Sequence, residues 1–289
     1  MADYGVIVKT VTLGLALLFA LPCLAATQRP LLVTSQDHSL VEIDDCEHFY
    51  ARTVAPSLPS RVQSEEQLPV ALAGVDTLRV RSTEGGAVSI KGWDRPVARL
   101  TLCKYAVALN DADAKRTLHD INVTTHNGEV SAHGPENGTT RAWWVHMILR
   151  VPKRVAVDVA STSGGIAIRR MNGRVTARAT NGGISLAECA GDSKLTSENG
   201  GISLEKITGR IDAGAQNGAI SLRVSDGDPQ TIEATTDDGG EILCRAKICH
   251  DALSHRIAGN KVLRIGGGSS EPMIRLHTGA APILIEQVR

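Results

Sequence analysis

Apolar and polar residues alternate along the chain in a pattern that recurs every eighteen positions. The sequence reads SGGIAI from Ser163, NGGISL from Asn181 and again from Asn199, and NGAISL from Asn217. Self-similarity at a fixed period predicts stacked units that bury a shared core. Two apolar columns keep this spacing: Ile166, Ile184, Ile202 and Ile220 in the first, and Ile168, Leu186, Leu204 and Leu222 in the second.

Each unit divides into two segments that alternate with a period of two, as in residues 202–205 and residues 211–215. Such alternation predicts β-strands with one buried face. A left-handed hexapeptide helix has the same coil length, but its shorter sub-period would align Ile166 with Asn172 and Arg178, which differ in polarity. We therefore predict an all-β, single-domain β-solenoid, or β-helix, with about eighteen residues and two strands per coil.

Asparagine and glycine mark one end of each coil, where the chain must turn. Both residues tolerate the positive φ that tight corners require. The asparagine column can form a polar edge that contacts a ligand, or its amides can stack and bond the turn backbone. We favour the second interpretation. The predicted turn repeat consists of Asn181, Gly182, Gly183, Asn199, Gly200, Gly201, Asn217 and Gly218.

The same period recurs more loosely on both sides of the regular repeat. We expect earlier coils at EGGAVSI from Glu84 and HNGEVSA from His126. We expect a later coil at DGGEIL from Asp238 and a final coil at TGAAPILI from Thr278. An insertion within residues 223–240 displaces the later coils, because it breaks the eighteen-residue spacing.

Three segments follow from composition. Residues 1–26 have the apolar run and the small final residues of a secretory signal peptide, and an uncleaved N-terminal anchor is the alternative. Residues 27–68 are irregular and are a candidate cap for the open end of the solenoid, and residues 69–289 form the solenoid domain. Within that domain, one short helix is predicted over residues 111–119, with Asn110 as its N-cap.

Charge argues against nucleic acid and against catalysis. The formal net charge of the chain is zero, so no basic excess exists to neutralise phosphates. Stacked at eighteen residues, the charges fall in columns of alternating sign, which predicts ion-pair ladders rather than paired carboxylates for acid–base chemistry. The columns contain Arg170, Glu188 and Lys206; Arg174, Asp192, Arg210 and Asp228; and Lys194 with Asp212.

Removal of the leader leaves five cysteines, so at least one is free or bonded to another chain. Because export permits disulfides, Cys46 with Cys103 and Cys244 with Cys249 are the candidate pairs, and Cys189 is expected to be buried. A metal or haem site in the segment after Cys244 is an alternative, but its C-x4-C spacing is not that of a usual zinc site. We predict no cofactor and no metal.

Over most of its length, from Phe49 to Arg289, the chain resembles the bacterial "putative adhesin" domain family of exported β-solenoid proteins. The resemblance rests on LRVRSTEGGAVSIKGWDRP, on MILRVPKRVAVDVASTSGGIAI and on the NGGISL coils that follow. The family's motifs are structural, and they imply no catalytic residues. The five cysteines and the insertion within residues 223–240 depart from the family pattern.

We therefore predict a non-enzymatic envelope or surface protein that acts in adhesion, binding or scaffolding. It is exported to the periplasm, cell surface or medium, with no transmembrane span after leader cleavage. Its expected partner is an unidentified envelope, surface or glycan component. The alternative is a polysaccharide-active β-helix enzyme. Trp93, Trp143 and Trp144 are the large candidates for a sugar platform, although packing at the end of the solenoid is the interpretation we favour.

Overall fold

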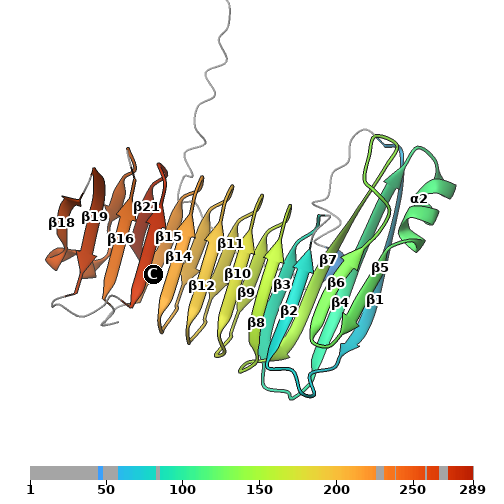
Figure 1. Cartoon of the computed structure of the whole chain (residues 1–289), viewed down its shortest axis with the longest axis horizontal. Coiled ribbons are helices and arrows are strands. Elements are labelled where there is room, and N and C mark those ends of the chain that lie inside the picture. Colours follow the sequence, from blue (N-terminus) through green and yellow to red (C-terminus); the bar gives the residue numbers. More distant parts are fainter. Residues whose placement is uncertain are drawn as a thin grey trace, which may run out of the picture. The chain divides into compact units, whose positions relative to one another are not determined.

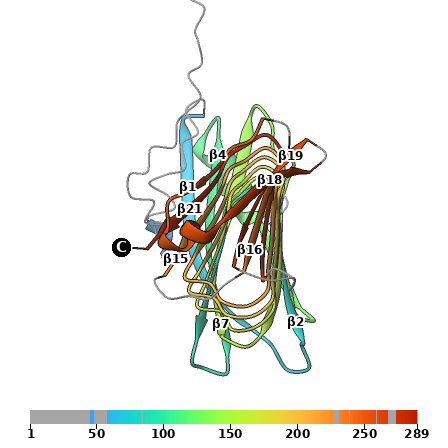
Figure 2. The same cartoon turned by 90° about the vertical axis from the view of Figure 1, so that its left-hand side faces the viewer.

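Two facing β-sheets enclose one apolar core in the computed structural model of this chain (Figures 1 and 2). The structure describes residues 45–47, 58–82, 85–225, 231–237, 239–257, 259–266 and 273–288. Along the regular repeat, successive strands belong to opposite sheets, so each pair of strands makes one coil. The predicted all-β solenoid with two strands per coil is confirmed. The predicted leader, residues 1–26, lies outside the described residues.

Sheet A contains ten strands, in the spatial order β1 (Ser60–Val70), β4 (Ala98–Ala108), β7 (Arg141–Pro152), β3 (Val88–Trp93), β9 (Ile166–Arg169), β11 (Ile184–Ala187), β13 (Ile202–Glu205), β15 (Ile220–Val224), β21 (Ile283–Gln287) and β17 (Ile242–Cys244). β1 pairs antiparallel with β4, and β4 pairs antiparallel with β7. From β7 onward all neighbours run parallel. Sheet A is therefore a parallel solenoid face extended by an antiparallel end.

Sheet B contains eleven strands, in the spatial order β18 (Leu253–Ile257), β19 (Asn260–Ile265), β16 (Ile232–Thr236), β20 (Ile274–Thr278), β14 (Ile211–Ala215), β12 (Ser193–Ser197), β10 (Val175–Ala179), β8 (Ala156–Ser161), β2 (Thr77–Ser82), β6 (Glu129–His133) and β5 (Asn122–His126). The strands from β16 to β6 run parallel, and an antiparallel hairpin closes each end. The hairpins cover the parallel ladder where it would otherwise present an open edge.

The eighteen-residue register predicted from the sequence is present in the backbone pairing. In sheet A, Ile184 pairs with Ile166 on one side and with Ile202 on the other. In sheet B, Val175 pairs in the same way with Val157 and Ser193. Since the spacing places equivalent residues side by side, the alternation buries the same column in every coil.

Two coils lie out of sequence order. The coil β20–β21 is last in the chain, but β20 pairs with both β14 and β16, and β21 pairs with both β15 and β17. The prediction that TGAAPILI forms the final coil is therefore wrong. This segment contributes to a coil that lies inside the stack, between β14–β15 and β16–β17. Near the other end, β2 and β3 lie between β6–β7 and β8–β9 in the same way.

The helix α2 (Asp111–His119) lies at the β1 end of the stack, where it contacts β1, β4 and β7 (Figure 1). Asn110 caps it, since its side-chain oxygen accepts a hydrogen bond from the Asp113 backbone N–H at 2.9 Å. Ala114 and Thr117 are its buried residues. The predicted helix and its cap are both confirmed. No helix in the described part of the chain is long and apolar enough to cross a membrane.

Two further expectations for this end of the chain are corrected. The segment 27–68 was expected to be irregular, but its last residues belong to the eleven-residue strand β1. Backbone pairing with β4, rather than an apolar pattern in its own sequence, holds β1 at the edge of sheet A. The segment HNGEVSA supplies β6, which pairs parallel with β2 as expected of an earlier coil, but its turn differs from the NGGISL corner. Its Asn127 and Gly128 have φ of 51° and 71° and form the turn of the β5–β6 hairpin.

At the opposite end, a short 3-10 helix, η1 (Lys247–Asp251), follows β17 and contacts β19. Ile248 and Cys249 of η1 pack against the main core. The expected coil at DGGEIL supplies β17, although Asp238 lies outside the described residues. The solenoid is thus covered at this end by η1 and at the other by α2.

Candidate binding surface

The outward-facing side chains of the two sheets form the candidate binding surface, because the inward-facing side chains are buried in the core. In sheet B one row crosses nine strands. Arg79 lies between Glu129 and Asp158, and the alternation of sign resumes beyond Thr176. The rest of the row is Lys194, Asp212, Arg275, Glu233 and Arg264.

Several of these outward charges are engaged in ion pairs. Asp158 accepts from Arg81 at 2.9 Å and from Arg178 at 3.3 Å. At the far end of the row, the Arg264 Nε donates to Glu233 at 2.7 Å. Half-exposed pairs of this kind each contribute little to stability, about 0.2–1 kcal/mol. They do neutralise the face, so the outer surface of sheet B is built of cross-strand pairs.

In sheet A the corresponding row has two different halves. On the β13 side it alternates in sign: Glu205 and Arg223 lie 3.5 Å apart, and Glu286 follows on β21. On the other side four basic residues occupy neighbouring strands without an acidic residue between them. This cation row consists of Arg99 on β4, Arg150 on β7, Lys91 on β3 and Arg169 on β9.

Trp93 borders the cation row, two residues beyond Lys91 on the same face of β3. Its indole N–H donates to the Val97 carbonyl at 2.8 Å, which fixes the ring. The guanidinium carbons of Arg95 and Arg99 lie 5.1 Å and 5.8 Å from the ring centroid. These are cation–π distances. Trp93 therefore contacts one arginine of the row, Arg99, and one beside it, Arg95.

The coil corners carry two further ladders. The Asn199 amide donates to the Asn181 side-chain oxygen at 3.0 Å, and Asn217 donates to Asn199 at the same distance. These amides bond one another along the stack, while the glycines after them pack against the backbone of the preceding coil. The Gly182 and Gly218 positions have no room for a side chain, since a Cβ there would lie 2.4 Å and 2.2 Å from a carbonyl oxygen.

At the opposite corner, Arg170, Glu188 and Lys206 share one column and adopt left-handed φ of 57°, 53° and 49°. The Arg170 Nε donates to Glu188 at 2.9 Å. This hydrogen bond, together with the positive charge of neighbouring Arg169 and Lys206, lowers the pKa of the Glu188 carboxyl. The ladder keeps Glu188 ionised, so it is not suited to act as a general acid. In the second predicted column, Asp228 lies outside the described residues.

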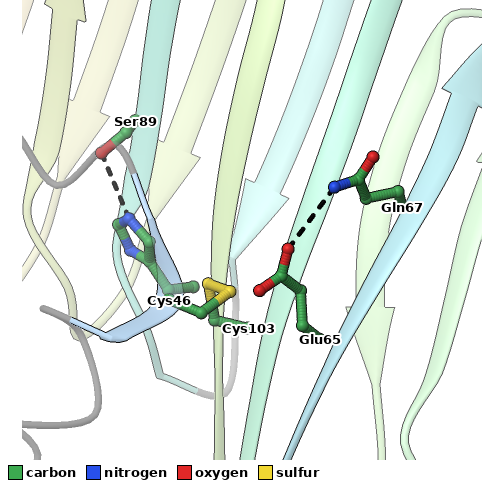
Figure 3. The surroundings of a disulfide bond; sticks show 6 residues. Cys46, Glu65, Gln67, Ser89 and Cys103 are labelled. Atoms are coloured by element: carbon green, nitrogen blue, oxygen red, sulfur yellow. Dashed lines mark hydrogen bonds between the residues drawn. A yellow bond between two sulfur atoms is a disulfide. The ribbon is translucent and has the colours of Figure 1, made fainter.

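The structure joins both pairs of cysteines that were candidates for disulfides. Cys46 bonds to Cys103 on β4, and Cys244 bonds to Cys249 on η1. Figure 3 shows the first bridge, with Glu65 and Gln67 of β1 nearby. Cys46 and Cys103 belong to a small apolar cluster on the outside of sheet A that is separate from the main core.

His146 lies directly opposite Cys103, and its Nε2 is 3.2 Å from the Ser89 hydroxyl. Burial lowers the pKa of His146 to about 4, although a hydrogen bond with the Ala87 backbone opposes the shift. Sequence reasoning did not single out this pair, because only the β3–β7 pairing brings Ser89 and His146 together. A base with so low a pKa is a poor activator of a serine at neutral pH.

The remaining sequence candidates are structural. The Trp143 indole is fully buried and donates to the Pro135 carbonyl at 2.6 Å, and Trp144 is 5.8 Å from the Tyr105 ring. Cys189 is buried, and desolvation raises its pKa to about 11, so it is a poor nucleophile. Within the described ranges, no group of three or more His, Cys, Asp or Glu side chains is placed to hold a metal ion.

A small polar hollow lies on the β5–β6 hairpin, lined by Thr124, His126, Asn127, Glu129 and Ser131. Within this hollow, the Thr124 and Ser131 hydroxyls lie 2.8 Å apart and form a hydrogen bond with each other.

The fold of the chain is therefore a largely parallel β-solenoid, and its outer faces carry rows of charged side chains. Residues 76–247, more than half of its length, match the Toastrack DUF4097 family. The chain belongs to this family, which confirms the resemblance predicted from its motifs. No curated protein matches it in sequence.

Solved structures that this chain matches include a putative cell adhesion protein from Clostridium sporogenes, 10% identical, covering 78% of this chain and 100% of that one, with a TM-score of 0.39. A putative adhesin from Bacteroides fragilis is 11% identical, covers 80% and 99%, and has a TM-score of 0.40. A putative lipid binding protein from Parabacteroides distasonis is 9% identical, covers 78% and 97%, and has a TM-score of 0.24.

Proposed function

We propose that this protein is a non-enzymatic binding or scaffold protein of the cell envelope or surface. The observation that supports the proposal is the arrangement of the outward-facing charged residues. On both sheets they form charged rows along the stacked strands, a surface suited to contact with an extended partner. Export through a leader at residues 1–26 belongs to the same proposal, with the mature protein acting in the periplasm, at the cell surface or outside the cell.

The catalytic alternative is a polysaccharide-active β-helix enzyme. A glycoside hydrolase of this kind needs a pair of carboxylates flanking the bond that it cleaves. Glu205 and Glu286 lie on the outer face of sheet A, but Arg223 stands between them. Glu188 is held ionised by Arg170. These residues therefore do not support a glycoside hydrolase, and the binding function is the one we propose.

Two measurements test the proposal. The first compares the intact chain with a variant lacking residues 1–26, fractionated into cytoplasm, periplasm, membranes and medium. We expect the intact chain outside the cytoplasm and the variant inside it. The second mixes purified mature protein with envelope fractions and measures binding and glycan turnover. Saturable binding without turnover is expected. Cytoplasmic retention of the intact chain, absence of binding by folded protein, or turnover would each overturn the proposal.

A further inference from the structure

Strand β18 is the terminal strand of sheet B, at the end of the stack opposite α2 (Figure 1). All five of its residues are exposed, and Leu253 is the most exposed large apolar side chain in the described part of the chain, at 71%. Ile257 is 53% exposed. Leu253 pairs with Arg264, which belongs to the outward row of sheet B, so both apolar side chains lie on the outer face. The row of charged side chains therefore ends in an apolar edge.

The terminal strands elsewhere in the described sheets carry features that discourage pairing with another chain. Strand β1 contains Pro69 and charged residues such as Arg61 and Glu65, and β17 is only three residues long. Proline, charge and shortness all protect a sheet edge. The one charged arginine of β18, Arg256, donates from its Nη1 to the Gly259 carbonyl at 3.3 Å, so its guanidinium is held beside the hairpin turn. β18 is thus the least protected of these edges.

The β18–β19 pairing determines which backbone groups point to the open edge. Ile257 and Asn260 pair across a connection of two residues, so their backbone groups bond to each other. Hydrogen-bonded and non-hydrogen-bonded pairs alternate along an antiparallel ladder. The backbone N–H and C=O groups of Ser254 and Arg256 therefore point away from β19. The open edge offers two donors and two acceptors to a further strand.

A second copy of β18 matches these edge groups. When two β18 strands run antiparallel about a two-fold axis at His255, Ser254 of each copy faces Arg256 of the other, and the two residues exchange both backbone hydrogen bonds. The same register places Leu253 of each copy opposite Ile257 of the other. These are non-hydrogen-bonded positions, where facing side chains approach most closely. A shift of two residues would keep the hydrogen bonding but would place an apolar side chain opposite His255.

We propose that β18 is a dimerisation edge, through which two copies of this chain pair antiparallel and continue sheet B across a two-fold axis. This inference goes beyond the proposed function and does not depend on it. The edge is short, so we expect a weak dimer with a dissociation constant on the order of 0.1 mM. The protein is then monomeric at low micromolar concentration and dimerises where it is locally concentrated.

Sedimentation velocity of the purified mature protein, from low micromolar to millimolar concentration, measures this association. The first test variant is Ser254→Pro, which removes a backbone N–H that the dimer uses and that β19 does not; proline is tolerated on the open side of an edge strand. The second is Leu253→Lys, which replaces an apolar contact with a charge. The matched control is Leu109→Lys, the same change at a side chain that is 55% exposed outside β18. Circular dichroism and thermal unfolding establish that each variant is folded.

A mixing experiment tests the register. Leu253→Lys and Ile257→Glu should each weaken self-association. An equimolar mixture of the two variants should restore dimers, because the introduced lysine and glutamate face each other on one side of the axis. On the other side of the axis, the unaltered Ile257 of the first variant faces the unaltered Leu253 of the second.

We expect the sedimentation coefficient of the unaltered protein to rise with concentration. Ser254→Pro should weaken association by roughly tenfold or more, because the two-fold axis makes each substitution remove two backbone hydrogen bonds. Leu253→Lys should weaken it by roughly threefold to thirtyfold, and the control should stay within about twofold. A monomer at every concentration, equal losses in control and test variants, or no recovery in the mixture would overturn the inference. If the protein stays monomeric but the β18 variants lose binding to envelope fractions, the edge serves another partner; the dimer is then rejected and the proposed function stands.

Discussion

At the scale of single residues, the coil corners and the outer face of β7 hold the most constrained positions. Gly182, Gly200 and Gly218 pack against the backbone of the preceding coil, so the close spacing of the stack excludes any side chain there. His146 is buried beside Ser89 and is kept neutral by desolvation. Both features have consequences that a measurement of stability can detect.

Gly200→Ala should destabilise the protein by about 1–3 kcal/mol, because the added Cβ would lie 2.4 Å from the Gly182 carbonyl oxygen. Gly214→Ala is the matched control, since nothing lies within 4 Å of a Cβ at that position. The control should be neutral or slightly stabilising because alanine restricts the unfolded chain. Thermal and urea unfolding measure both. Equal stability of the two variants would show that the corner is not closely packed.

Acid should weaken the fold through His146. The unfolded state takes up a proton near pH 6.5, whereas folded His146 stays neutral down to about pH 4. The unfolded state therefore binds more protons between these values, and stability falls as the pH falls through this window. Between pH 7.5 and 5 the loss attributable to His146 is about 2 kcal/mol.

Urea unfolding of the unaltered protein, His146→Gln and His255→Gln at both pH values measures this loss. His146→Gln should have the shallower pH dependence, whatever its stability at neutral pH. His255→Gln, which changes an exposed side chain of β18, should retain the dependence of the unaltered protein. Identical pH dependence in all three proteins would contradict the predicted role of burial.

At the scale of elements, the coil β20–β21 has an unusual position. It is formed from the last residues of the chain, yet it pairs on both sides with strands that precede it. Ile274 and Ile283 continue the apolar columns of the regular coils and are fully buried. The continuity of both sheets therefore depends on a segment that is remote in sequence from β14 and β15.

Ile283→Ala should cost about 2–5 kcal/mol, because it leaves a cavity between Ile220 and Ile242 in the core column. Leu284→Ala, one residue along on the outer face of β21, is the matched control and should cost less than about 1 kcal/mol. Urea denaturation with both variants measures the difference. Comparable losses would contradict the placement of β21 in the middle of sheet A.

At the scale of the whole molecule, the described chain behaves as a stack in which each coil contacts its neighbours. The pairing partners of β11 are β9 and β13, and those of β12 are β10 and β14. In such architectures stability is approximately a sum over units and the interfaces between them. A coil can therefore be removed without loss of fold, provided that the register of the remaining coils is kept.

Deletion of residues 184–201 should give a folded protein with one coil fewer, because Gly183 would join Ile202 as Gly201 does in the native chain. We expect a β-sheet circular dichroism spectrum, cooperative unfolding and reduced stability. The matched control deletes residues 184–192, half a coil, and should not fold because it reverses which sheet each later strand must join. Failure of the full-coil deletion alongside the half-coil deletion would contradict the modular interpretation.

The sequence predicts the regular coils because their information is local. The spacing of Ile166, Ile184, Ile202 and Ile220 fixes both the strand and its register, and Asn110 marks the start of α2. The order of the end coils is not predictable in this way. Strand β20 pairs with β14 and β16, which are remote from it in sequence, and no local sequence pattern predicts these partners. β1 was missed for a related reason: its edge position leaves most of its residues partly exposed, so the alternation is weak.

The candidate surface was only partly accessible from sequence. The alternating columns of the repeat follow directly from the eighteen-residue spacing. The cation row does not, since Arg99, Arg150 and Lys91 come from segments outside the repeat that align only through the β4–β7–β3 pairing. The Ser89–His146 contact depends on the same non-local pairing. Both arrangements therefore depend on the register between strands that are distant in sequence, which the repeat pattern does not predict.

The interior position of β20–β21 also sets the timing of folding. The segment that forms β20 is synthesised after β14 and β16, so the position between these two strands stays empty until residues 274–278 have emerged from the ribosome. Before that moment the nascent protein exposes unpaired strand edges on both sides of the gap, which makes it vulnerable to mispairing with other chains. Strands β20 and β21 therefore complete both sheets, and we expect a chain truncated before β20 to leave the two sheets interrupted.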